Sequence, residues 1–248
     1  MSMTATATAI PFARLFRAEF RKATDTRAAR WLLAVAVLLA LAAQAVPLAF
    51  PRDIRQARAS FLTWAALGLS RLLPIAVMLT MTAEWSQRTA LTTFTLEPRR
   101  GRVLAAKVTA GVAVTAAGGC LAFGIAQAGL AVAAAAGRHP GGGWSGPELA
   151  GFAVFLLLTS GIGIAIGCAL HNTAAAIVTY FALAALTSLL LIPAVARVGD
   201  YVNPSQTLGW VLTGDWTGHG AQIASSAATW IALPLAIGTI RTLRRDVT

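Results

Sequence analysis

Six blocks of apolar residues, each long enough to cross a lipid bilayer, constrain the fold of this chain more than any other feature. A helix rises about 1.5 Å per residue, so a hydrocarbon core of about 30 Å takes about 20 residues. A single apolar block that crosses it must be helical, because its backbone polar groups find no water there. The expected spans are residues 31–50, 61–83, 108–136, 149–170, 174–192 and 222–240. We therefore expect an all-α membrane protein, with residues 1–248 forming a single domain.

Charge is scarce and lies almost entirely between these blocks. Only 12% of the residues are charged and 57% are hydrophobic, whereas soluble domains carry about 25% charged residues. Fourteen of the twenty Lys and Arg fall before the first span, between the second and third spans, or in the tail, against five in the alternate loops. The positive-inside rule then predicts a multi-pass protein of the inner or plasma membrane with both termini cytoplasmic. This distribution explains the net charge of +11 without a nucleic-acid partner.

Residues 12–23 are predicted to form an amphipathic helix ahead of the first span. At 100° per residue Phe12, Phe16 and Phe20 share one face, and the basic residues occupy the other. This pattern is typical of a helix lying at the cytoplasmic surface of a membrane. Glu19 interrupts the apolar face. Its carboxylate either reaches water or turns inward to pair with a cation of the protein.

The segment between the second and third spans, residues 84–107, is predicted to contain a second short helix at Thr89–Leu96. Pro98 ends it, because the residue before a proline is biased away from helix. A basic cluster follows, consisting of Arg99, Arg100 and Arg102. Glu84 and Arg88 are spaced i, i+4 and are expected to pair with each other.

Arg71 is the one charged residue inside an apolar block. It precedes Glu84 by 13 residues, or about 20 Å along a straight helix. Burying a charge near the bilayer centre costs at least about 2.5–3.5 kcal/mol, so the guanidinium needs water or a partner. It either extends to the outer headgroups or lies on a water-accessible path or a subunit interface.

Several chemistries lack their usual residues. The phosphate loop G-x-x-x-x-G-K-[ST] is absent, since Lys22 and Lys107 are the only lysines and neither is followed by Ser or Thr. The expected spans carry no Asp or Glu, which ion-coupled carriers use to bind their ion. No histidine has a partner at metal-ligand spacing. We therefore expect no metal site and no catalytic residue, and keep an ion-coupled secondary transporter or a membrane-embedded enzyme as the alternatives.

Glycine and proline predict local features of three spans. Gly163-x-x-x-Gly167 permits close helix contact, either within the chain or at a dimer seam. The long third span is expected to tilt or break near Gly118 and Gly119. Pro234 is expected to kink the last span.

Four segments, in this order, are similar to those of one family of membrane proteins. They are Arg17–Lys22 with Thr26-Arg27, Glu84–Thr89 with Leu96–Lys107, His171–Ala176, and Arg244–Val247. The first resembles an amphipathic elbow helix, and the second an acidic-x-x-x-Arg-Thr segment with its Pro-Arg-Arg run. Over nearly its whole length the chain resembles permease subunits of type-2 ATP-binding-cassette transporters, the kind that exports drugs, antibiotics or polysaccharides.

The resemblance implies a dimer with an identical or different second permease, and two cytoplasmic ATPase subunits that hold the ATP and Mg. The chain itself would bind no cofactor and would move a hydrophobic or amphipathic substrate outward. In that family a coupling helix after the second span docks on the ATPase, and the residues that this implies here are Thr89, Ala90, Leu91, Phe94, Leu96, Arg99 and Arg100. The alternative is that this helix lies on the bilayer.

Two further sets of residues are candidates. Our hypothesis is that a coupling network through Glu19, Glu84 and Arg88 ties the elbow helix to the coupling segment. The second set follows from the resemblance. Spans two and five would line the dimer axis, which makes Trp64, Arg71, Tyr180 and Thr187 candidates for the substrate path. Arg71 departs from the family pattern and leaves an anionic substrate open.

Overall fold

The computed structural model describes residues 10–50, 58–189, 196–216 and 218–244, and its regular structure there consists of helices without a strand. The expectation of an all-α chain is therefore confirmed for this part of the sequence. The first seven helices are α1 (Phe12–Asp25), α2 (Arg27–Ala43), α3 (Ala45–Ala49), α4 (Arg58–Leu69), α5 (Leu73–Ser86), α6 (Ala90–Leu96) and α7 (Arg100–Ala135). They are followed by α8 (Gly146–Leu170), α9 (Thr173–Leu189), α10 (Ala196–Val202), α11 (Pro204–Thr213), α12 (Gly220–Ala227), the π-helical turn η1 (Ala228–Ala232) and α13 (Leu233–Arg244).

Five helical stretches are long and apolar enough to cross a membrane, as in a multi-pass membrane protein. They are Arg27–Ala49, Arg58–Ser86, Arg100–Ala135, Gly146–Leu170 and Gly220–Arg244. α9 is apolar as well, with 17 residues. The last three residues of the expected span 174–192 lie outside the described residues, as do Arg52, Arg55 and Arg245 of the charge count.

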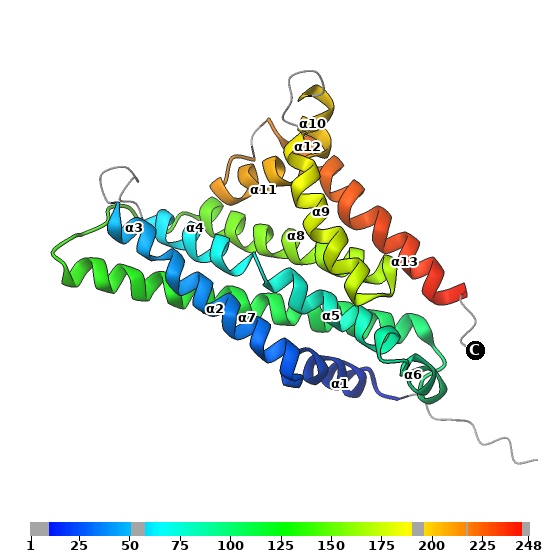
Figure 1. The fold of residues 1–248 in the computed structure, drawn as a ribbon. Helices are drawn as coiled ribbons and strands as arrows, with labels where there is room; N and C mark the ends of the chain where they lie inside the picture. The colour runs from blue at the N-terminus through cyan, green and yellow to red at the C-terminus, as the bar shows by residue number, and fades with distance from the viewer. Residues whose placement is uncertain (1–9, 51–57, 190–195, 217, 245–248) are drawn as a thin grey trace, which may run out of the picture.

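α7 and α8 form the centre of the bundle. α7 packs against α1 and α4, while α8 packs against α5, α11 and α13. Figure 1 shows α1, α6 and the last turn of α13 at one end of the bundle, and α3 with the start of α4 at the other. The three segments richest in basic residues are thereby gathered at the first end.

The second span is not one helix but two, a feature that the sequence analysis missed. α4 ends at Leu69, and α5 begins at Leu73, so Arg71 lies in the break between them. Pro74 stands in the first turn of α5. Its ring disfavours the helical conformation of the residue before it, and it has no N–H to continue the hydrogen-bond ladder from α4.

The third span, by contrast, is continuous in α7, so of the two features expected near Gly118 and Gly119, a tilt or a break, the break is wrong. A side chain at Gly118 would meet Leu69 and Leu73, and one at Gly119 would meet Leu156. These glycines make room for neighbouring helices rather than interrupting their own. In the last span the distortion expected at Pro234 is a π-helical turn that ends two residues earlier.

Gly163 and Gly167 pack within the chain, in agreement with the first of the two interpretations. A Cβ at Gly163 would fall against the Pro74 carbonyl oxygen, and one at Gly167 would lie 3.1 Å from the Met78 carbonyl oxygen. Both glycines therefore let α8 approach the backbone of α5.

Replacing Gly163 by alanine is expected to destabilise the protein, because the new methyl group meets a backbone oxygen that no rotamer change can move. Overpacking of this kind costs about 1–3 kcal/mol. Gly124→Ala in α7 is the matched control, since its Cβ would meet nothing within 4 Å. Thermal unfolding of both variants in detergent checks this. Equal melting temperatures would show that α5 and α8 are not in close backbone contact.

Candidate functional site

Four charged side chains from three helices form a closed ring of alternating sign, which we call the charge cluster. It consists of Glu19 and Lys22 from α1, Glu84 from α5 and Lys107 from α7. Lys22 Nζ lies 2.7 Å from Glu19 Oε1 and 2.7 Å from Glu84 Oε1. Lys107 Nζ lies 2.8 Å from Glu19 Oε2 and 3.2 Å from Glu84 Oε2. Each carboxylate therefore bridges both ammonium groups, and the ring has no net charge.

Three members of the charge cluster are buried and the fourth is open to solvent. The side chains of Glu19, Glu84 and Lys107 are 5%, 6% and 7% exposed, whereas that of Lys22 is 45% exposed. Lys107 donates hydrogen bonds to Glu19 Oε2 and, at 3.2 Å, to the Thr80 carbonyl, and it is ion-paired with Glu84 as well. A buried charge is tolerated when it is paired and hydrogen-bonded, as here.

Lys22 keeps its charge over the physiological range. Burial alone would lower the pKa of Lys22, but its hydrogen bonds and ion pairs with Glu19 and Glu84 outweigh that effect, and the pKa lies above its ordinary value. A raised lysine pKa stabilises the fold fully below the pKa of the unfolded side chain, about 10.4. This stabilisation is lost only as the pH rises through the folded pKa.

Local structure explains how each helix delivers its residue. Thr26 caps α2, because its hydroxyl accepts a hydrogen bond from the Ala29 N–H at 3.2 Å. The cap marks the point at which α1 ends and α2 begins. α1 is thereby a separate helix, and it packs on α7. At the end of α5 the Thr89 N–H donates to the Glu84 carbonyl at 2.9 Å, while Arg88 adopts a left-handed φ of 57°. The chain thus leaves the helix just after Glu84.

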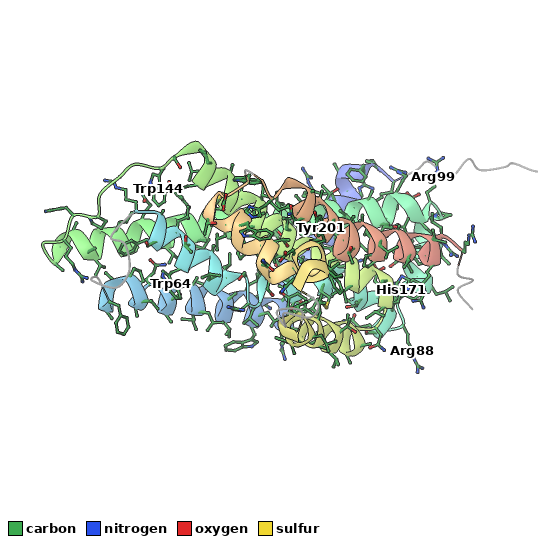
Figure 2. The ribbon with its side chains drawn as sticks, turned by 90° about the horizontal axis from the view of Figure 1, so that it is seen from above. Trp64, Arg88, Arg99, Trp144, His171 and Tyr201 are labelled. Carbon is green, nitrogen blue, oxygen red and sulfur yellow. The ribbon has the colours of Figure 1, made fainter. Side chains whose placement is uncertain are left out.

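This helix end overturns two expectations from the sequence. Arg88 does not pair with Glu84, because the i, i+4 spacing acts only on a continuous helix, and within the described chain Arg88 has no ion pair. Its side chain is exposed and points away from the bundle (Figure 2). Glu84, expected in the segment after the second span, lies instead in the last turn of α5, within the helical stretch Arg58–Ser86.

The inward interpretation of Glu19 is confirmed, but its partners were not foreseen. Lys22 and Lys107 are the only lysines among the twenty basic residues, and both belong to the charge cluster. That rarity is the signal that the sequence offered. An ammonium group is compact and can donate to two carboxylates at once, whereas guanidinium is a planar fork.

α6 is attached to the charge cluster through one hydrogen bond. Thr93 Oγ1 donates to Glu84 Oε1 at 3.0 Å. Ala90 of α6 is buried, and Thr89 stands at its N-terminus without a capping hydrogen bond from its side chain. A movement of α6 therefore acts directly on the residue that bridges both lysines.

The structure separates the expected docking residues into two groups. Leu91 and Leu96 are 53% and 68% exposed. Phe94 is instead half-buried, since its ring contacts Trp85 at 6.1 Å between centroids and the Arg100 guanidinium lies 5.1 Å from its centre. Arg100 also donates to the Thr242 carbonyl of α13 at 3.0 Å, whereas Arg99 is exposed (Figure 2).

The candidate path residues are only partly brought together. Arg71 and Tyr180 line one cavity, of about 230 Å³. Thr187 is buried beside it, where its hydroxyl lies 3.5 Å from Ser205 Oγ of the cavity wall. Trp64 is not among the lining residues and lies toward the far end of the bundle from His171 (Figure 2).

No group of three or more potential metal ligands occurs in the part of the chain that the structure describes. In comparisons with protein-family models, curated proteins and solved structures, nothing matches the chain. The geometry therefore stands by itself as the basis for a function.

Lys107→Met is expected to lower the free energy of unfolding by about 3–5 kcal/mol, because it leaves two buried carboxylates facing one cation. Adding Glu19→Gln leaves the neutral pair of Lys22 and Glu84, so the double variant should be more stable than Lys107→Met. Thermal unfolding of the two single variants and the double variant measures this coupling. Strictly additive losses would show that Glu19 and Lys107 do not act together.

Proposed function

We propose that this chain is the permease subunit of a type-2 ATP-binding-cassette exporter, in which α6 receives the ATPase. The observation that carries the proposal is the arrangement around α6. It is a short helix at the end of the bundle with two exposed leucines, and it is hydrogen-bonded to a buried charge cluster that joins α1, α5 and α7. A docked partner that moves α6 thereby moves three helices.

The exposed surface of α6 suits a protein groove. Leu91 and Leu96 present apolar side chains that an amphipathic-helix groove would cover. Beside α6 a cavity of about 550 Å³ opens between α1, α2 and α5, and Lys22, Glu84 and Lys107 line it. The ATPase would press on this side of the bundle. The partners are then two ATPase subunits and a second permease protomer.

The proposed topology has six spans, with both termini in the cytoplasm. α8 ends next to the end of α13, since Arg241 donates to the Ala169 carbonyl at 2.6 Å. Because α9 follows α8 directly, the chain must leave this end through α9 before the last span returns. α9 thus supplies the sixth crossing, and α1 serves as the elbow helix. The positive-inside rule assigns this basic end to the cytoplasm.

The charge cluster argues against an ion-coupled carrier. Glu84 is a buried carboxylate near α6, at the end of the helical stretch Arg58–Ser86. Each of its two oxygens is paired with a lysine. An incoming cation would find no uncompensated carboxylate there. A carboxylate with both oxygens paired to lysines is expected to hold helices together and not to bind a transported ion.

Replacing Leu91 and Leu96 together by aspartate is expected to abolish the Mg-ATP hydrolysis that purifies with the full-length chain from its native membrane. The charged side chains cannot enter an apolar groove, and their exposure keeps the fold intact. Val198→Asp in α10, also at an exposed apolar position, is the matched control and should retain the activity. Transport by the purified chain in vesicles without any nucleotidase would overturn the proposal.

A further inference from the structure

The break in the second span places a cation at the middle of the bilayer. Arg71 lies 13 residues after Arg58 and 15 before Ser86 in the helical stretch Arg58–Ser86, which is about 20 Å from either end. Non-helical backbone occurs at this depth only where it is enclosed by protein or lines a water-filled cavity. Broken helices of this kind are where membrane transporters bind their substrates and coupling ions.

Arg71 has no internal counter-ion. Among the described residues no carboxylate lies within ion-pair distance of its guanidinium, and no hydrogen bond to it is formed. The charge cluster differs, because each of its charges has two opposite charges as neighbours. Arg71 is exposed on the surface of the single chain, so at the bilayer centre its guanidinium lacks the compensation that contact with hydrocarbon would require.

The cavity beside Arg71 supplies room for a ligand. Its volume is about 230 Å³, and its walls come from the α4–α5 break, α8, α9 and α11. Two of its hydroxyls already donate to their own helices, Ser70 to the Leu67 carbonyl and Thr159 to the Phe155 carbonyl, both at 2.9 Å. A third, Ser205, lies 3.5 Å from Thr187 Oγ1. Within the described chain, the Arg71 guanidinium and the Tyr180 hydroxyl are the lining donors without an acceptor, and they remain for a ligand.

The rest of the wall is apolar. It is formed largely by Leu67, Phe155, Ile162, Leu183, Leu208 and Leu212. One strong cation beside an extended apolar surface matches a molecule with one negative group on a hydrophobic body. Guanidinium is the side chain best suited to hold a carboxylate or phosphate, through two parallel hydrogen bonds.

We propose that this cavity binds an amphipathic anion, with its acidic group on Arg71 and its apolar body along α8, α9 and α11. This inference deepens the proposed function, on which it rests, by naming the class of substrate. Arg71 selects for the negative charge, and the neighbouring leucines bind the body.

The test is binding of a fluorescent fatty acid, 11-(dansylamino)undecanoic acid, to the full-length chain in phosphatidylcholine nanodiscs. The matched probe is its neutral amide, and no ATPase is present. Arg71→Gln should weaken binding of the acid about tenfold or more, since a charge-assisted hydrogen bond is lost, and leave the amide unchanged. Arg71→Lys should restore most of the affinity. Arg58→Gln, an exposed arginine on α4 outside the cavity, is the control and should bind both probes normally.

Equal affinity of the unaltered chain for acid and amide, or an equal loss in Arg58→Gln, would overturn the inference. Added phosphatidylglycerol separates two sources of the anion. If it displaces the acid only when Arg71 is present, the site accepts bilayer lipid, and if it does not, the site takes a soluble amphiphile. Both results support the site.

The binding assay contains no ATPase, so its outcome is independent of the Leu91 and Leu96 experiment. If that experiment gives the expected loss of ATP hydrolysis but the acid does not bind, only the substrate class is wrong. If the acid binds but ATP hydrolysis does not depend on Leu91 and Leu96, only the exporter proposal is wrong.

Discussion

The closed ring of Glu19, Lys22, Glu84 and Lys107 is the interaction on which the arrangement of the helices at the basic end depends. Moving any one of these charges out of water costs several kcal/mol, and one opposite charge rarely offsets that fully. Here every charge has two opposite neighbours between 2.7 and 3.2 Å away. The compensation exists only when α1, α5 and α7 stand together, so the ring fixes their mutual positions.

Such a ring also transmits force better than apolar packing does. Apolar contacts are non-directional, and helices can slide across them with little change in buried area. The hydrogen bonds within these ion pairs hold only over a narrow range of distance and angle, so the helices that share them are expected to move as a unit. Glu84 is the member that also accepts from Thr93 of α6. A push on α6 in the proposed exporter would therefore reach α1 and α7 through one residue, while the exposure of Lys22 lets water enter the ring from one side.

The sequence predicted the helical class, the short helices that became α1 and α6, and a close helix contact at Gly163 and Gly167. Each of these depends on local pattern or composition. It could not predict which cation Glu19 would meet, because Lys107 is 88 residues away and only the packing of α1 on α7 brings them together. The break at Ser70–Leu72 was missed for another reason. Arg71 is the only charge in an otherwise apolar block, and a proline that follows it closely is compatible with a kinked continuous helix as well as with a break. The pairing of Glu84 with Arg88 was wrong because the helix ends two residues after Glu84.

The broken second span joins the two sites that the structure presents. α5 begins beside Arg71 and ends just beyond Glu84, so one helix of 14 residues has the cavity that Arg71 lines next to its first turn and the charge cluster at its last. Its neighbour α8 approaches it through Gly163 and Gly167, which have no side chains of their own to interlock with α5 and which come close to the Pro74 and Met78 carbonyl oxygens. A glycine face offers less resistance to a shift along the helix axis than a ridge of side chains does. Since a turn separates α5 from α4 at the break, a displacement of α5 need not carry α4 with it. In the proposed exporter, movement at the ATPase end would therefore shift α5 and so change the shape of the cavity around Arg71.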